Sequence, residues 1–259
     1  TVGNDVDKCG ANVFYLTPIA DDNCSVTVTQ QAGPLPGALF PVGTTLVSYK
    51  ATDPSGNMAT CSWTITVTDM QLPDIQCPSG VQTFATNLGN CSWTVPSTMI
   101  DATASDNCGV TSLTNSFNSG TTLSGAVFPL GATIVSWTAR DAAGNSRVCT
   151  FRVNVQDLTD PTVQSCPAPI VVSNTTGVCG AAVTYTVLFQ DNCDGTGKTG
   201  TLIEGLTSGS TFPVGTTTVI WRYVDVASND FAECQFTVKV NDTQFPTITC
   251  PGNITVNTD

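Results

Sequence analysis

An all-β fold built of tandem β-sandwich domains is predicted by three observations. The segment FPVGTTLVSYKATDPSGN at residues 40–57 recurs at 128–145 and, less closely, at 212–230. Apolar and polar residues alternate along the segments that follow these copies, as they do in half-buried strands. The predicted strands are rich in Thr and Val and are separated by Gly, Pro, Asn and Asp, with no amphipathic helical window. Copies spaced by about 85 residues are long enough for each to bury its own core.

Each repeat is expected to form a separate sandwich of about seven strands, with one strand near its beginning and a hairpin near its end. In the first repeat the early strand points Cys9, Ala11, Val13 and Tyr15 inward. The hairpin closes through the Gly-Asn turns at 56–57 and 144–145, and in the third repeat through the serine-containing turn at 225–229. Alternation along the first hairpin strand predicts these inward residues: Val47, Tyr49 and Ala51; Val135, Trp137 and Ala139; Val219, Trp221 and Tyr223. On the second hairpin strand Cys61, Trp63, Ile65 and Val67 share the inward face.

The repeats divide the chain into domains at 1–72, 73–160 and 161–245, followed by the start of a fourth at 246–259. The first domain lacks the Cys-Pro segment that opens the others, and the last segment contains little else. We therefore expect either one window of a longer periodic polypeptide or a subunit that completes its neighbour by lending a strand. The expected partners are further repeats or other copies of the same protein.

Composition excludes several function classes. The 259 residues carry a net charge of -12 and no histidine, so no basic surface exists for nucleic acid or for an anionic membrane. No apolar run approaches the roughly 20 residues that span a bilayer, so direct membrane insertion is not expected. Without histidine, catalysis by a histidine-activated nucleophile is impossible. The chain has only two glutamates, Glu204 and Glu233, so a general acid and base would have to be aspartates, most of which stand in turns. We expect no catalytic residue and no enzyme.

The twelve cysteines predict a disulfide framework, because they stand at constant offsets and form no C-x-x-C pair typical of zinc or redox sites. Disulfides persist outside the cytoplasm, which indicates an extracellular or cell-surface protein. Four cysteines per repeat allow three connectivities, and an up-and-down order of strands selects one of them. The expected pairs are Cys9–Cys61, Cys77–Cys108, Cys91–Cys149, Cys166–Cys193 and Cys179–Cys234. Cys24 and Cys250 lack partners within the chain, and we expect them to pair with a preceding Cys-Pro and a following Asp-Asn-Cys.

Four motifs together resemble the hyalin repeat (HYR) domain. They are the Cys-Pro start at Cys77, Cys166 and Cys250, the Asp-Asn-Cys, the Phe-Pro-(Val/Leu)-Gly core and the closing Cys-x-(Phe/Trp)-x-(Ile/Val)-x-Val. The resemblance covers nearly the whole chain. It implies immunoglobulin-like extracellular modules with a role in adhesion or surface structure, and it brings no catalytic residues.

Aspartates gather at the repeat boundaries, where every junction reads Asp-x-x-x-Pro. The candidate calcium ligands are Asp69, Asp74, Asp106, Asp157, Asp160, Asp191 and Asp242, with the hairpin residues Asp53, Asp141 and Asp225 nearby. Hard oxygen ligands at a junction could hold Ca²⁺ and stiffen it. The alternative is that they are solvated turn and linker residues, with proline alone stiffening the linker.

Two functional classes follow. The first is a structural or adhesive stalk or filament, supported by the repeats and the junctions. The second is a ligand-binding or enzyme-accessory module, for instance carbohydrate-binding, which would need an exposed aromatic platform. The tryptophans fall in inward phase, so we expect them in the core: Trp63, Trp93, Trp137 and Trp221.

Overall fold

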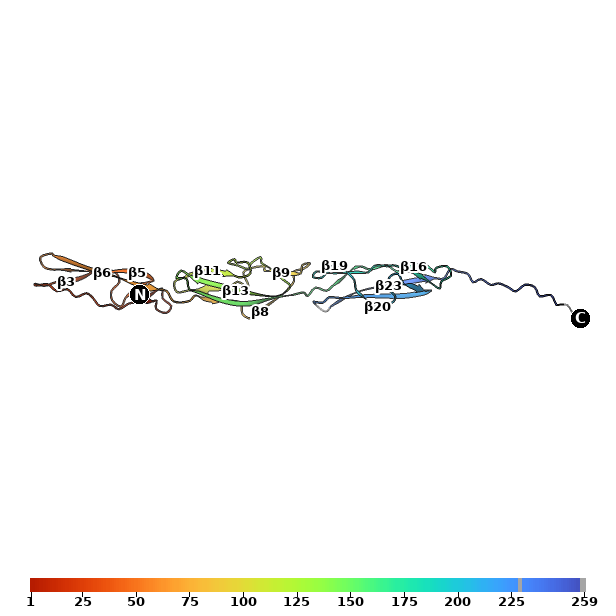
Figure 1. The fold of residues 1–259 in the computed structure, drawn as a ribbon, viewed down its shortest axis with the longest axis horizontal. Coiled ribbons are helices and arrows are strands. Elements are labelled where there is room, and N and C mark those ends of the chain that lie inside the picture. The colour runs from red at the N-terminus through yellow and green to blue at the C-terminus, as the bar shows by residue number, and fades with distance from the viewer. Residues whose placement is uncertain (228–229, 257–259) are drawn as a thin grey trace. The chain divides into compact units, whose positions relative to one another are not determined.

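The computed structural model describes residues 1–227 and 230–256, which form 23 strands and no helix. Contacts divide the chain into two compact units, one made of residues 1–84 and 94–155 and the other of 85–93 and 156–259. The fold is all-β, with tandem immunoglobulin-like sandwich domains stabilised by disulfides. Figure 1 labels several of the strands described below, among them β5, β6, β13 and β23.

The first sheet of unit 1 is built on a long antiparallel hairpin. Its strand order is β1-β6-β5-β3, and a separate two-stranded sheet pairs β2 with β4. Val47 faces Trp63 across the hairpin, while β1 runs parallel to β6. The bounds are β1 Val2–Gly3, β2 Gly10–Asn12, β3 Thr27–Ala32, β4 Leu39–Pro41, β5 Gly43–Thr52 and β6 Met58–Thr68.

The second repeat of the sequence repeats this plan and adds the strand that follows Cys-Pro. The order is β11-β13-β14-β8, and β7 pairs with β10. The bounds are β7 Asp74–Gln76, β8 Val81–Ala85, β9 Ser92–Thr94, β10 Thr103–Ser105, β11 Val110–Asn115, β12 Val127–Pro129, β13 Gly131–Asp141 and β14 Ser146–Gln156. Strand β9 spans the boundary between the two units.

Unit 2 holds the corresponding hairpin, β22 and β23. The sheets are β16-β23-β22-β20, β15-β18-β19 and β17-β21, and β16 runs parallel to β23. The bounds are β15 Thr162–Ser165, β16 Ile170–Ser173, β17 Gly180–Ala182, β18 Leu188–Asp191, β19 Gly195–Lys198, β20 Thr201–Glu204, β21 Thr211–Pro213, β22 Gly215–Val224 and β23 Phe231–Asn241. The predicted turn at 225–229 includes residues 228–229, which lie outside the described residues.

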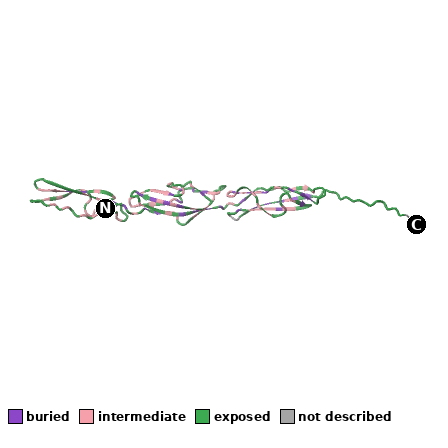
Figure 2. Ribbon diagram, viewed as in Figure 1, coloured by how far each residue is buried: buried purple, intermediate pink, exposed green. Residues whose placement is uncertain are grey.

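The repeated segment forms the core of each repeat, as predicted. The phenylalanine that opens each copy is fully buried, at Phe40, Phe128 and Phe212. Figure 2 colours the residues by burial, and on the hairpin strands β13 and β23 buried residues alternate with more exposed ones. Trp93 and Trp137 are buried, which confirms their inward phase, whereas Trp63 and Trp221 are half-buried against the cores of their own repeats.

Candidate cation sites and disulfides at the repeat junctions

The predicted disulfide pairings are wrong. The structure joins Cys77 to Cys149 and Cys166 to Cys234 within one repeat. It joins Cys9 to Cys108 and Cys91 to Cys193, and each of these bonds connects one repeat of the sequence to the next. The remaining cysteines, Cys24, Cys61, Cys179 and Cys250, are exposed free thiols. We call the two bonds between repeats the junction disulfides.

The error arose from the assumed up-and-down order of strands. The strand after Cys-Pro instead lies parallel to the last strand of its repeat, with Ile170 opposite Val238. Cys166 lies four residues before Ile170, and Cys234 lies four residues before Val238, so the parallel register brings the two cysteines together. Their Cα atoms are 5.7 Å apart, within the range that a disulfide spans.

Because the Cys-Pro cysteine pairs with the last cysteine of its repeat, the cysteine that follows it in sequence has no partner in its own repeat. Cys9 precedes β2 and is exposed rather than inward, and Cys61 on β6 is also exposed. Cys9 meets the Asp-Asn-Cys loop of the next repeat, with a Cα–Cα distance of 4.7 Å to Cys108. Cys91 and Cys193 are 4.5 Å apart in the same way.

Beside the Cys9–Cys108 disulfide, three carboxylates converge. One side-chain oxygen from each of Asp69, Asp106 and Asp141 lies within 4.8 Å of the others. Asp69 follows β6, Asp106 precedes Cys108, and Asp141 ends β13. Asp69 and Asp141 are 5% and 4% exposed. We call this group, with the neighbouring Asn107, junction site 1.

Hydrogen bonds hold the side chains of junction site 1 in place. Asp69 Oδ1 accepts from Gln71 N at 3.1 Å and from Asn107 Nδ2 at 3.3 Å. Asp106 Oδ1 accepts from Cys108 N at 2.9 Å. This is an Asx-turn, in which an Asp side chain bonds the backbone two residues further on. Asp69 Oδ2, Asp106 Oδ2 and Asn107 Oδ1 are buried and have no hydrogen-bond partner.

Junction site 2, in unit 2, has the same construction around the Cys91–Cys193 disulfide. Asp157 and Asp191 are 2% and 9% exposed and take the places of Asp69 and Asp106. Asn192 Nδ2 donates to Asp157 Oδ1 at 3.2 Å, as Asn107 does in site 1. Asp157 Oδ2, Asp191 Oδ2 and Asn192 Oδ1 are again buried without a partner.

A second acidic group adjoins junction site 2. One oxygen from each of Asp191, Asp194 and Asp225 lies within 4.8 Å of the others. Repulsion from the Asp230 carboxylate, a hydrogen bond to it, burial and repulsion from Asp225 raise the pKa of Asp160 above its usual range. Negative charge is therefore concentrated at this junction. Cys193 also lies close to Asp157 and Asp191, but its sulfur is held in the disulfide and is not a thiolate ligand.

Four of the predicted ligands come together in the two sites, namely Asp69, Asp106, Asp157 and Asp191. Asp74 lies apart, because its exposed carboxylate pairs with Arg147 at 3.2 Å. Asp160 is exposed, in contact with Asp230, and Asp242 is exposed on the segment after β23. The prediction left out the two asparagines of the Asp-Asn-Cys loops, although their repetition next to an aspartate was a usable signal.

The donor set of each site is suited to a hard cation. It offers carboxylate and amide oxygens, which are the ligands that Ca²⁺ prefers. The ion pairs in the described part of the chain involve Asp5, Asp74 and Glu233, so none reaches the carboxylates of site 1. Buried carboxylates that face one another without a cation are costly, which favours a bound metal ion.

A model of the HYR domain matches residues 3–67, 68–155 and 156–240. The chain is 35% identical to hyalin of Lytechinus variegatus over 257 residues, which cover 96% of this chain and 47% of that protein. It is also 35% identical to hyalin of Strongylocentrotus purpuratus, over 95% of this chain and 20% of that protein. The chain belongs to the HYR domain family. The chain spans about half of the first hyalin and a fifth of the second. Its HYR domains indicate a location outside the cell or at the cell surface.

The HYR chain also matches solved structures of other tandem domains. The titin I-band fragment I67–I69 matches with a TM-score of 0.37 and 11% identity, over 85% of this chain and 89% of that one. The protocadherin gammaB7 EC3-6 structure matches with a TM-score of 0.33 and 16% identity, over 85% and 67%. Scores this low carry no functional information. No helix in the described residues is long and apolar enough to cross a membrane.

Proposed function

We propose that this chain is part of a non-enzymatic extracellular protein, a stalk or surface filament of tandem HYR domains that bears load in adhesion. The overlap of the two junction disulfides is the main support. Cys91 lies inside the loop that Cys9–Cys108 closes. Tension applied across the chain would pass from Cys9 to Cys108, back along residues 91–108, and through Cys91 to Cys193. Only this short segment can lengthen between Cys9 and Cys193 while both bonds hold.

Single-molecule stretching tests this role. With the disulfides intact, unfolding should let Cys9 and Cys193 separate to at most about 60 Å, against about 600 Å after reduction. The control is the double variant Cys9→Ala, Cys91→Ala, which should reach about 400 Å without reductant, because the Cys77–Cys149 disulfide still bypasses the residues between these two cysteines. Equal extensions before and after reduction would contradict a load-bearing role for the junction disulfides.

We further propose that junction sites 1 and 2 each bind one Ca²⁺, which fixes each repeat against the next. In site 1 the ligands would be Asp69, Asp106, Asn107 and Asp141, and water would complete the six to eight oxygens that Ca²⁺ takes. In site 2 Asp157, Asp191 and Asn192 would serve, together with Asp225 of the adjoining acidic group. The alternative class, a sugar-binding module, receives no support from the tryptophans, since two are buried and two pack against cores.

A further inference from the structure

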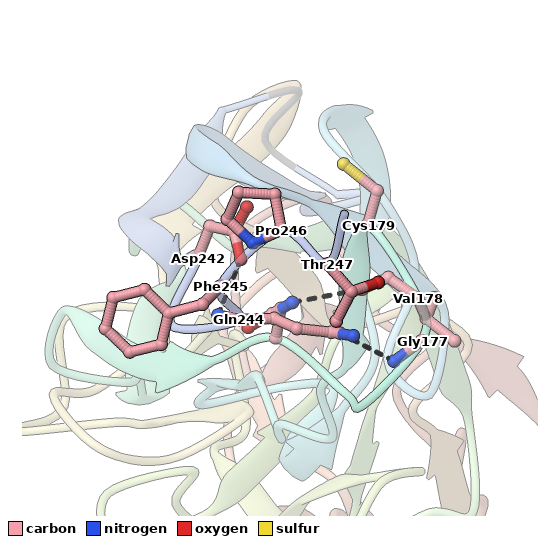
Figure 3. Close-up of a pocket in the computed structure, with 9 residues that line it drawn as sticks. Gly177, Val178, Cys179, Asp242, Gln244, Phe245, Pro246 and Thr247 are labelled. Atoms are coloured by element: carbon pink, nitrogen blue, oxygen red, sulfur yellow. Dashed lines mark hydrogen bonds between the residues drawn. The ribbon is translucent and has the colours of Figure 1, made fainter. Parts of the chain in front are cut away.

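One end of the third repeat carries a preformed half of a junction. Cys179 occupies the position that Cys9 and Cys91 occupy in the first two repeats. It borders a cavity of about 410 Å³ lined by Gly177, Val178, Asp242 and Gln244, among others. In Figure 3 the sulfur of Cys179 lies apart from the other labelled side chains. We call these five residues the socket.

The socket already has the internal hydrogen bonds of an occupied junction. Gln244 Oε1 accepts from Gly177 N at 2.8 Å (Figure 3). In unit 1 the corresponding Gln71 Oε1 accepts from Asp7 N at 2.9 Å. Asn174 Nδ2 donates to Val178 O at 3.3 Å, and the corresponding bond from Asn4 to Lys8 O is 3.2 Å. The third repeat therefore needs little rearrangement to form a junction.

Unit 1 shows what fills such a socket. There the loop with Ser105, Asp106 and Asn107 is docked beside Asp7 and Gln71, and a cavity of about 560 Å³ that these residues line stays open next to it. Asn107 Nδ2 donates to Lys8 O at 3.0 Å and to Asp69 Oδ1 at 3.3 Å. The occupant is thus the Asp-Asn-Cys loop of the next repeat, which ends in the disulfide to Cys9.

Unit 2 repeats these contacts. Asn192 Nδ2 donates to Asn90 O at 3.0 Å and to Asp157 Oδ1 at 3.2 Å. In the third repeat the corresponding acceptors are Val178 O and the carboxylate of Asp242. Asp157 is 2% exposed, whereas Asp242 is exposed, and within residues 1–227 and 230–256 no Asp-Asn-Cys loop covers it.

The first repeat carries the complementary half, which we call the plug: Asp22, Asn23 and Cys24, with Asp53 and Asn57 beside them. Asp22 Oδ2 accepts from Cys24 N at 3.1 Å, the same turn that Asp106 makes with Cys108 at 2.9 Å. Asp53 Oδ1 accepts from Asn57 N at 2.8 Å, as Asp141 does from Asn145. The plug therefore already makes two of the internal hydrogen bonds of a docked loop.

We propose that the socket binds the Asp-Asn-Cys loop of another HYR repeat and closes a disulfide from Cys179 to the cysteine of that loop. The plug of a second copy of this chain supplies such a loop. Because plug and socket differ, the contact is heterologous and can be extended head to tail. The assignment replaces the expected pairing of Cys24 with a Cys-Pro cysteine. It goes beyond the proposed function, since it names the partner and requires neither calcium nor load.

The bond forms by thiol–disulfide exchange. Both cysteine thiols are oxidised, each losing a proton and together two electrons, while a small-molecule disulfide such as oxidised glutathione is reduced to two thiols. The same asparagine contacts seen in sites 1 and 2 would align the loop cysteine with Cys179. Docking should therefore accelerate the specific pair over random thiol pairs.

The test uses the full chain carrying Cys61→Ser and Cys250→Ser, so that Cys24 and Cys179 are its free thiols. In glutathione buffer with EDTA we expect a ladder of disulfide-linked multimers and a cross-linked peptide that joins Cys24 to Cys179. Adding Asn23→Ala should slow the cross-linking by about tenfold, because it removes two hydrogen bonds. Gln31→Ala, an exposed change elsewhere in the first repeat, should leave the rate unchanged.

The proposal is overturned if no cross-link forms, if Cys24–Cys24 and Cys179–Cys179 are as frequent as Cys24–Cys179, or if Asn23→Ala has no effect. Each result is independent of the stretching and calcium experiments, because those depend on bonds and carboxylates within a single chain. A failure here would therefore leave the proposed function standing, and the reverse also holds.

Discussion

At the scale of single residues, the unpartnered oxygens of the junctions are the most informative feature. Buried polar atoms in folded proteins almost always have a partner, yet six buried oxygens at two equivalent places have none. Each set contains two aspartates and one asparagine from the same motif positions. One accident of side-chain placement would not recur with the same atoms, so the repetition points to a shared ligand.

The first prediction concerns Asp69. If each junction binds one Ca²⁺, calorimetry should find two ions per chain, and Asp69→Asn should leave one, because it removes a carboxylate from site 1 only. Asp74→Asn is the matched control, since this carboxylate belongs to the same junction but is exposed and paired with Arg147. Binding of two ions by the Asp69→Asn chain would rule Asp69 out as a ligand.

The second prediction concerns Asp160, whose pKa is raised chiefly by the neighbouring Asp230 carboxylate. A carboxyl whose pKa rises on folding contributes stability below its unfolded pKa, near 4, and that contribution is lost as the pH rises through the folded pKa. In calcium-free buffer, Asp160→Asn should therefore raise the melting temperature at pH 7 and have little effect at pH 3. A stabilisation that is the same at both pH values would argue against charge repulsion.

At the scale of elements, the parallel contact between β16 and β23 decides which cysteines meet. The third prediction is that the double change Cys166→Ala, Cys234→Ala lowers the free energy of unfolding of the third repeat by about 4 kcal/mol. The reason is that the bond closes a loop with a sequence separation of 68. Denaturant titration measures the loss. The control is Cys250→Ala, because Cys250 is a free thiol, and it should leave the third repeat's stability unchanged.

At the scale of the whole molecule, the proposed calcium ions would act on the same junctions as the disulfides. The fourth prediction is that EDTA lowers the melting temperature and makes the chain more flexible by small-angle scattering. Ca²⁺ at 100 times its dissociation constant would stabilise each site by about 3 kcal/mol. Identical melting and scattering in EDTA and in Ca²⁺ would mean that the carboxylates are turn and linker residues only.

The sequence alone determined the repeat, the all-β class and the core residues of the hairpins. These depend on local patterns: alternation places Val135 and Trp137 inward whatever lies beyond the sheet, and both are fully buried. It also pointed to Asp69, Asp106, Asp157 and Asp191, because aspartates before prolines and in Asp-Asn-Cys recur at each boundary.

Only the tertiary structure decided the disulfides and the composition of the sites. Whether Cys166 meets Cys193 or Cys234 depends on whether neighbouring strands run parallel or antiparallel, and alternation is the same in both cases. Whether Cys9 pairs within its repeat depends on contacts between repeats, about which the pattern inside one repeat says nothing. Likewise, Asp74 and Asp106 look alike in sequence, and only the packed junction turns one toward Arg147 and the other toward Asp69.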